Sequence, residues 1–292
     1  MKIYHIKNKI TGCLFLSVMA LACKPDGNPN NLPSVDASQY EGTIDGFRSS
    51  DEVLPESLIA YWSFDDTKNE LKSATAPTSS SNDSYVTDAI RGKSLSLAAG
   101  YVYYATQFQK FKTDSLKSWS LSTWVKIRNN GSKRTMLFQM ARPGVFNGNI
   151  NFALNTNGYN AANDSVLRIQ PTFSTVGGGT QDNLNNVLDK TNLNQWVHLL
   201  LTYEFTTGVF NIWMNGVKVG NFPNRGTGNN SFRSYEPSAV FFGANYNAAG
   251  MPVSSDVNFA PMTGQIDEVR FYNRALPDAF VRALYNLGRA NK

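Results

Sequence analysis

The sequence feature that most constrains the fold is a series of short apolar or alternating segments, each closed by polar turn residues. Residues 119–127 alternate, with Trp124 facing away from most of the other apolar side chains. Residues 209–214 and 217–219 are separated by Asn215-Gly216, which is the strongest short-range signal for a β-hairpin. Segments of this kind recur at spacings near ten residues, a pattern that predicts an all-β sandwich or barrel.

The composition agrees with strands rather than helices. Aromatic residues make up 12% and charged residues only 17% of the 292 residues, which suits strands joined by polar turns. Residues 276–287 are the one segment expected to be helical, because Pro277 suits a first turn and Gly288 can end the helix. The expected strands lie over residues 58–64, 94–97, 101–104, 119–127, 135–140, 150–154, 166–169, 196–203, 209–214, 217–219, 239–243 and 264–272.

The start of the chain has the pattern of a bacterial export signal that ends at a lipidated cysteine. A basic beginning is followed by the mostly apolar residues 10–22, which are too few to span a bilayer, since a helix needs about 20. The sequence Leu21-Ala22-Cys23 resembles a lipobox. We therefore expect a signal peptide over 1–22, lipid attachment at Cys23, and a location at the outer membrane or cell surface. The alternative is ordinary secretion with cleavage near Ala22.

Two further segments follow the signal. Residues 23–56 are rich in Pro, Asn, Ser, Asp and Gly, which predicts a flexible tether. The folded domain is expected over 57–290, an ordinary size for one all-β domain. Cys23 is the only cysteine after the signal, so the expected mature chain forms no internal disulfide.

The charge balance argues against a nucleic-acid partner. The formal net charge is +5, and the three lysines among residues 1–22 account for +3 of it. The remaining residues carry +2 and hold no basic block with interleaved aromatic side chains, which a nucleic-acid interface would need.

Five motifs occur in order over residues 58–290, and the most specific is the closing segment 264–276 with its core Gln265-Ile266-Asp267-Glu268-Val269-Arg270. The other four are Tyr61-Trp62-Ser63-Phe64-Asp65 and the segments 119–126, 194–203 and 212–216. Together they resemble bacterial laminin-G-like domains of the concanavalin-A-like superfamily, as found in surface lipoproteins of the Bacteroidetes type. The resemblance implies a jelly-roll sandwich of two antiparallel sheets with a short C-terminal helix. Because this superfamily serves many functions, it leaves the activity open.

Catalysis is not expected from the acidic residues or from the histidine. Glucanases of this fold carry carboxylates at alternate positions of one strand, where they share a face as a retaining mechanism requires. The adjacent acids here, such as Asp65-Asp66 and Asp267-Glu268, would point to opposite faces of a strand. His198 lies inside an apolar run and is expected to be packed and hydrogen-bonded. We therefore expect no enzyme, with a hydrolase or lyase as the least favoured alternative.

The resemblance also implies a structural Ca²⁺, held between the acid that follows the first strand and the acid in the last strand. In this chain those acids are Asp65 and Asp267, and carboxylate oxygens suit Ca²⁺. The alternative for Asp267 is a local ion pair with Arg270. Zinc is not expected, because the sequence holds no cluster of Cys and His.

Aromatic and amide residues in the expected loops are candidates for contacting a ligand. Sugar recognition combines an aromatic face with a few placed hydrogen-bonding groups. The alternative for each residue is an ordinary polar turn, and the tryptophans Trp62, Trp124, Trp196 and Trp213 are expected in the core or on a sheet face. The candidate ligand-binding residues are Arg142, Phe146, Asn147, Asn149, Arg233, Tyr235, Asn245 and Tyr246.

These observations favour a non-catalytic surface lipoprotein whose domain binds carbohydrate. The alternative is a protein-binding or adhesion module. The expected partners are a glycan or a surface protein, and the membrane through the lipid anchor.

Overall fold

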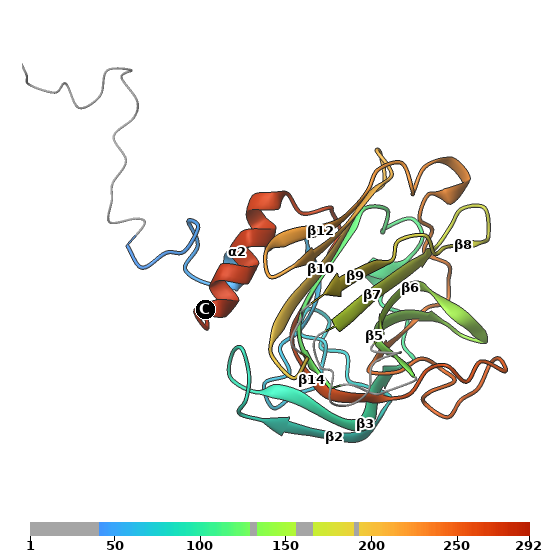
Figure 1. The fold of residues 1–292 in the computed structure, drawn as a ribbon, viewed down its shortest axis with the longest axis horizontal. Helices are drawn as coiled ribbons and strands as arrows, with labels where there is room; N and C mark the ends of the chain where they lie inside the picture. Colours follow the sequence, from blue (N-terminus) through green and yellow to red (C-terminus); the bar gives the residue numbers. More distant parts are fainter. Residues whose placement is uncertain (1–40, 129–132, 156–165, 190–192) are drawn as a thin grey trace, which may run out of the picture. The chain divides into compact units, whose positions relative to one another are not determined.

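Backbone pairing joins the strands of the described residues into one continuous antiparallel sheet, which curls into two layers (Figure 1). The structure is a computed structural model that describes residues 41–128, 133–155, 166–189 and 193–292. The expected signal peptide, Cys23 and the first part of the expected tether lie outside these residues. The predicted all-β architecture is confirmed.

The strands and helices follow the predicted series, with several additions. The short 3₁₀ turns are η2 (Ser50–Glu52), η3 (Gln109–Phe111) and η4 (Gly228–Asn230), and the α-helix is α2 (Asp278–Arg289). The strands are β1 (Leu58–Trp62), β2 (Ser79–Val86), β3 (Ser94–Tyr104), β4 (Trp119–Ile127), β5 (Arg134–Arg142), β6 (Val145–Asn155), β7 (Val166–Ser174), β8 (Thr180–Gln181), β9 (Asn186–Asp189), β10 (Val197–Glu204), β11 (Val209–Met214), β12 (Val217–Phe222), β13 (Ala239–Phe242) and β14 (Met262–Tyr272).

The two layers share strand β3, which is why they form one sheet and not the two separate sheets expected. The first layer runs β12-β11-β10-β4-β14, and the second runs β13-β5-β6-β7 with β8 and β9 at its edge. The first part of β3 pairs with β14 and its last residues pair with β13. The pairing of β3 with β2 and its pairing with β14 both shift in register beside Gly100. A Cβ on Gly100 would meet the Ser81 carbonyl at 2.4 Å. Such bulges increase the local bend of a strand, and here they carry β3 from one layer to the other.

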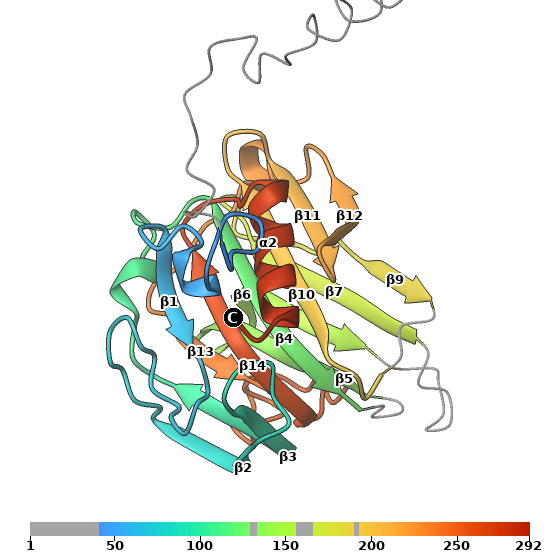
Figure 2. The same cartoon turned by 90° about the vertical axis from the view of Figure 1, so that its left-hand side faces the viewer.

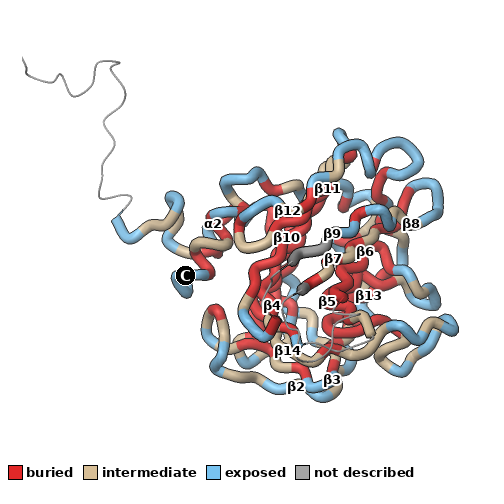
Figure 3. The backbone as a smooth tube through the Cα atoms, viewed as in Figure 1, coloured by how far each residue is buried: buried red, intermediate tan, exposed pale blue. Residues whose placement is uncertain are grey.

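An aromatic core fills the space between the layers, and Figure 3 shows that buried residues are concentrated in the strands of both layers. Trp62 and Phe64 from β1 and the residues after it meet Phe242 of β13, with ring centroids 5.0 and 5.3 Å apart in edge-on geometry. Trp62 and Phe242 are fully buried. Aromatic pairs of this kind each add about 0.5–1.5 kcal/mol of stability beyond the burial of their surface area. They therefore stabilise the packing of β1 against β13.

Helix α2 covers the outer face of the first layer, as Figure 2 shows. Its buried side includes Val281, Leu284 and Leu287, which pack against Leu200 and Trp213. The helix begins after Pro277 and ends two residues later than predicted. Among the described residues, no helix is both long enough and apolar enough to cross a bilayer.

The folded unit begins earlier than the sequence indicated. Ile44, Phe47 and Leu54 pack against the cluster beneath α2, and the Phe47 ring lies 6.0 Å from that of Phe280. The compact unit runs from Gly42 to Lys292. Residues 42–56 therefore belong to the fold, although the whole of 23–56 was predicted to be a tether.

The outer face of the second layer is only partly covered. The loop 244–261 packs over β13 and the neighbouring part of β5, where Phe241 and Ala141 lie beneath Tyr246. The face formed by β5, β6 and β7 beyond this loop carries polar side chains at alternate positions. This face holds the candidate site.

Candidate functional site

A groove of about 210 Å³ lies on the uncovered face of the second layer. Its floor is built from directly opposed residues on three adjacent strands. Met136 of β5 pairs with Ala153 of β6, which pairs in turn with Gln170 of β7. Met136 and Ala153 are almost fully buried. Gln170 Oε1 is enclosed and has no hydrogen-bond partner among the described residues.

A second row of polar residues crosses the same three strands beside the first row. Asn151 of β6 is the register partner of both Gln139 and Thr172. Gln139 Nε2 donates to Asn151 Oδ1 at 2.7 Å, and Asn151 Nδ2 donates to Thr172 Oγ1 at 2.8 Å. Because each amide is held by its neighbour, Asn151 and Thr172 are fixed in orientation where they line the groove.

Two phenylalanines form the aromatic side of the groove. Phe146, at the start of β6, lies edge-on to Phe259, with ring centroids 5.8 Å apart. Phe259 is brought there by the backbone, since Arg134 N–H donates to the Asn258 carbonyl and Ala260 N–H donates to the Arg134 carbonyl. The Arg134 guanidinium lies 4.7 Å from the Phe259 ring centroid. Both rings are partly exposed.

The remaining lining is polar and exposed. Asp182 and Asn185 come from the segment between β8 and β9, and Asn147 follows Phe146. The groove thus combines two aromatic rings, several amides, one hydroxyl, one carboxylate and one guanidinium. Such a set can pack against the apolar face of a sugar ring while binding its hydroxyl groups.

Four of the residues predicted from sequence gather around Tyr235. Tyr235 lies beneath two guanidinium groups, those of Arg142 at 4.4 Å and Arg233 at 5.0 Å from its ring centroid. Asn149 is fully buried. Its Nδ2 donates to the Tyr235 carbonyl at 2.8 Å, and its Oδ1 accepts from the Tyr235 N–H at 2.9 Å. Asn149 therefore positions Tyr235 and does not offer a surface to a ligand.

Asn245 and Tyr246, also predicted to contact a ligand, have a packing role in the structure. Asn245 is fully buried, and its Oδ1 accepts from the Ala248 N–H at 2.9 Å. Tyr246 is 6% exposed and lies edge-on to Phe241 with centroids 5.0 Å apart. Both residues hold the loop 244–261 on the sheet. A ligand could therefore not reach them without moving that loop.

The groove residues that sequence reasoning missed are Met136, Asn151, Ala153, Gln170, Thr172 and, from the loops and the strand end, Arg134, Asp182, Asn185 and Phe259. A signal for the floor was present in the sequence. Asn149-Ile150-Asn151 and Gln170-Pro171-Thr172 place polar residues at every second position, which marks one polar face of two strands.

The two acids predicted to flank a metal converge on one loop. Asp65 Oδ1 accepts from the Lys93 N–H at 2.6 Å, and Asp267 Oδ2 accepts from the Ile90 N–H at 2.7 Å. Burial raises the pKa of Asp267 to about 8, helped by the nearby charges of Glu268 and Asp65. The predicted alternative partner of Asp267, Arg270, instead binds Glu268 and Asp51.

The donor set at this point suits a cation with hard oxygen ligands. Asp267 is fully buried and its Oδ1 has no hydrogen-bond partner among the described residues. An additional cation would compensate this carboxylate and its repulsion from Asp65. Within the described residues, no group of three or more acidic, His or Cys side chains could hold a metal, so backbone carbonyls and water would have to complete the coordination.

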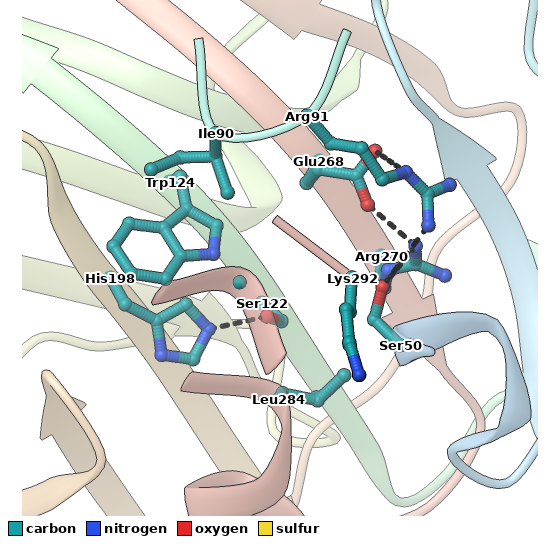
Figure 4. A pocket seen from close by; sticks show the side chains of 11 residues that line it. Ser50, Ile90, Arg91, Ser122, Trp124, His198, Glu268, Arg270, Leu284 and Lys292 are labelled. Carbon is teal, nitrogen blue, oxygen red and sulfur yellow. Dashed lines mark hydrogen bonds and ion pairs between the residues drawn. The ribbon is translucent and has the colours of Figure 1, made fainter. Parts of the chain in front are cut away.

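A small pocket of about 10 Å³ lies between the first layer and α2 (Figure 4). His198, one of its lining residues, is fully buried, and its Nε2 lies 2.8 Å from Ser122 Oγ. Burial lowers the pKa of His198 to about 3. The ring is therefore neutral at ordinary pH and closed to substrate, which confirms the prediction of a packed histidine.

A larger cleft of about 630 Å³ lies at one end of the sandwich, beside β1. Its buried acid, Glu70, accepts hydrogen bonds from the backbone N–H groups of Tyr61, Lys72 and Ser73. Glu70 thus shapes the adjoining loop. Among the described residues that line this cleft, Phe108 is the one aromatic residue, and it is 5% exposed, so the cleft offers less ring surface than the groove over β5–β7.

Comparison with known protein families gives a match to more than half of this chain. The family described as the concanavalin A-like lectin/glucanases superfamily matches residues 99–282. No curated protein matches the sequence significantly.

Solved structures with the same fold are distant in sequence. Domain 4 of AbnA, a GH43 extracellular arabinanase from Geobacillus stearothermophilus in complex with arabinotriose, aligns with a TM-score of 0.51 and 20% identity, over 78% of this chain and 98% of that chain. The ligand-binding domain of botulinum neurotoxin serotype D, in complex with N-acetylneuraminic acid, aligns with a TM-score of 0.55 and 11% identity, over 82% of this chain and 52% of that chain.

The binding domain of Paraclostridial Mosquitocidal Protein 1 aligns with a TM-score of 0.56 and 14% identity, over 79% of this chain and 52% of that chain. This chain therefore spans about half the length of each of the two toxin binding domains. At these identities the likeness concerns the fold alone.

Proposed function

We propose that this chain, which belongs to the concanavalin A-like lectin/glucanases superfamily, binds carbohydrate in the groove over β5, β6 and β7. One observation carries the proposal: Phe146 and Phe259 stand beside a floor of fixed amide and hydroxyl groups. A ring of a sugar presents an apolar face and an edge of hydroxyls, and both find partners here.

The floor favours binding because its polar groups are already oriented. Asn151 is 3% exposed, and its amide is fully hydrogen-bonded to Gln139, Thr172 and the backbone of Gly148, so its part is to hold Thr172 in place for a ligand. A ligand that binds such groups orders few additional side chains, which lowers the entropic cost of association. Two of the similar folds were solved with arabinotriose and with N-acetylneuraminic acid, and this supports a carbohydrate as the ligand class.

Binding without catalysis fits the acid content of the groove. Most glycoside hydrolases use two carboxylates that flank the scissile bond. Asp182 is the one carboxylate among the described residues that line the groove. His198 lies under α2 and away from the groove, which is on the other layer.

The test is a glycan array followed by calorimetric titration with the purified protein and its Phe146→Ala and Phe259→Ala variants. We expect each variant to weaken binding at least tenfold, or about 1.4 kcal/mol. Phe280→Ala is the matched control, since Phe280 is a partly exposed phenylalanine on α2, over the opposite layer. Unchanged affinity in both groove variants would place the ligand elsewhere, and capture of a protein partner that free glycan does not displace would favour the adhesion alternative.

We propose in addition that Asp65 and Asp267 hold a structural Ca²⁺. The support is the orphaned, buried Asp267 Oδ1 beside a second carboxylate. When bound, the ion would supply charge compensation where the first and last strands meet the loop 88–93. Calcium should raise the melting temperature and chelator should lower it. Asp267→Asn should lose this response, whereas a calcium response that persists in the variant would assign the ion to another place.

We propose display at the cell surface through a lipid on Cys23. The support is the pattern of the first 23 residues. Mass spectrometry of the protein from membranes should show a diacylglyceryl cysteine at the new N-terminus. Cys23→Ser should release the protein from the membrane fraction, and a variant that stays bound would exclude the anchor.

A further inference from the structure

We propose that the glycan bound in this groove is acidic, and that Arg142 and Arg233 bind its negatively charged group at the end of the β5–β6 hairpin. The inference rests on the proposed function, since it names the class of ligand for the same site. It is carried by the pair of guanidinium groups over Tyr235.

The two guanidinium groups are placed together by one ring. The Arg142 Cζ lies 4.4 Å and the Arg233 Cζ 5.0 Å from the centroid of Tyr235. Arg142 is half-buried and Arg233 is exposed, so both can reach a bound molecule. A guanidinium over an aromatic face keeps its N–H groups free at the edge of its plane, where they can form bidentate bonds to a carboxylate or sulfate.

Buried polar groups fix the ring that carries this pair. Tyr235 OH donates to the Thr175 carbonyl at 2.8 Å, and Asn149 binds both backbone groups of Tyr235. Ser174 Oγ donates to the Arg233 carbonyl at 2.5 Å, and Ser174 is 1% exposed. The backbone of Arg233 and the ring of Tyr235 are thus held by the sheet itself, so both guanidinium groups pack on a ring that is fixed in place.

The pair carries positive charge that the described residues do not neutralise. Neither Arg142 nor Arg233 is within salt-bridge distance of a carboxylate in the part of the chain that the structure describes. The adjacent acid in sequence, Glu236, accepts a hydrogen bond from the Thr113 N–H at 3.0 Å through its Oε1. Two like charges held at one ring repel each other, and a bound anion would relieve that repulsion.

The pair is linked to the groove through the β5–β6 hairpin. Arg142 is the register partner of Val145, and Phe146 follows directly. Gln139 Nε2, from the floor, donates to the Phe146 carbonyl at 3.0 Å. Residues 146–149 therefore connect the aromatic wall to the amide that fixes Tyr235. Among the described residues that line the groove, Arg134 adds a third guanidinium and Asp182 is the single carboxylate, so the charge of this part of the site favours an anionic chain.

The test uses an array of matched acidic and neutral oligosaccharides: oligogalacturonates and their methyl esters, sulfated galactans and their desulfated forms, and sialylated glycans and their asialo forms. We expect binding to at least one acidic member and at least tenfold weaker binding to its neutral partner. The acidic class that binds distinguishes a carboxylate from a sulfate ligand. Equal affinity for both members of every bound pair would overturn the inference while leaving carbohydrate binding intact.

Variants then separate the arginine pair from the groove. Arg142→Gln and Arg233→Gln should each lower the affinity for the acidic ligand at least fivefold. Each should change the affinity for the neutral partner less than twofold. Arg282→Gln on α2 is the control, since it removes an exposed arginine from the opposite layer. Raising the salt concentration should weaken wild-type binding more than that of the double arginine variant.

Three outcomes of these titrations decide between the two proposals. If the double arginine variant binds the acidic ligand as wild type does, the arginine pair is not the anion site. If the arginine variants weaken binding and Phe146→Ala and Phe259→Ala do not, the anion site stands and the groove fails. If no member of the array binds, both proposals fail.

Discussion

The backbone of Gly288 lies against the indole of Trp124. A Cβ built on Gly288 would be 2.7 Å from both Trp124 Cζ2 and Trp124 Nε1. Trp124 is 3% exposed and is also stacked on Tyr285, with centroids 5.8 Å apart. The close approach of helix to sheet at this point therefore depends on a residue without a side chain.

Gly288→Ala should destabilise the protein, because the added methyl group must push α2 away from the first layer. We expect a loss of about 1–3 kcal/mol in the free energy of unfolding, as for other overpacked sites. Urea denaturation followed by tryptophan fluorescence measures it. Gly179→Ala is the control, since a Cβ there meets only Thr175 Oγ1 at 3.7 Å. Equal stability of the two variants would mean that α2 is free to shift.

His198 should make the protein less stable as the pH falls. Burial lowers its pKa in the folded state to about 3, whereas an unfolded chain has a histidine pKa near its ordinary value of about 6.5. Between these values the unfolded state binds the proton and the folded state does not, so stability is full above pH 6.5 and decreases below it. The decrease should approach about 1.4 kcal/mol for each further pH unit.

The measurement is urea denaturation at pH 7 and pH 5 for the wild type and His198→Gln. Carboxylates also titrate in this range, so the difference between the two proteins isolates the histidine. The wild type should lose about 2 kcal/mol more than the variant over this interval. Parallel losses in both proteins would show that His198 takes up a proton without unfolding.

The buried ion pair between Glu268 and Arg270 should be costly to break from one side. Their atoms Oε2 and Nη2 are 2.5 Å apart, and the side chains are 6% and 2% exposed. Arg270→Met would leave Glu268 without this partner, with Arg91 3.4 Å away as its remaining cation. We expect a loss of about 3–5 kcal/mol in the free energy of unfolding.

A double-mutant cycle checks this prediction. Glu268→Gln combined with Arg270→Met removes both charges, so the double variant should be more stable than the sum of the two single losses predicts. Strict additivity would show that solvent or another group already compensates Glu268.

The sequence predicts most of the fold because the core strands carry their own signal. Residues 119–127 were expected to form a strand, and β4 covers Trp119–Ile127. Strand β2 was missed, since Ser79–Val86 is largely polar and joins the sheet only by pairing with the edge of β3. Alternation of apolar and polar residues arises because one face of a strand is buried. A strand that buries few side chains, such as β2, therefore lacks this pattern.

The candidate site was predictable only in small part for a similar reason. Phe146 and Asn147 were found because aromatic and amide residues cluster in a short turn. Phe259 lies in a loop without periodicity and reaches the groove through a backbone bridge to Arg134, which no local pattern encodes. The same loop contains Tyr246, which packs on Phe241, so a residue typical of a binding surface is used for packing.

Asn149 should act on ligand binding through Tyr235, without touching the ligand. Its amide accepts from the Tyr235 N–H and donates to the Tyr235 carbonyl. Asn149→Asp keeps the accepting oxygen and removes the donor, so the Tyr235 carbonyl loses its partner. Leaving one buried acceptor unpaired costs about 1–3 kcal/mol of stability, and Tyr235 with its two arginines should become less well positioned.

The readout that distinguishes positioning from stability alone is the ratio of affinities for matched acidic and neutral oligosaccharides. In Asn149→Asp this ratio should fall at least threefold, while binding to the neutral partner changes less than twofold. Thr172→Val is the comparison, since it removes the hydroxyl that accepts from Asn151 in the groove floor and should weaken both ligands alike. An unchanged ratio in Asn149→Asp would mean that Arg142 and Arg233 find the anion without the support of the buried amide.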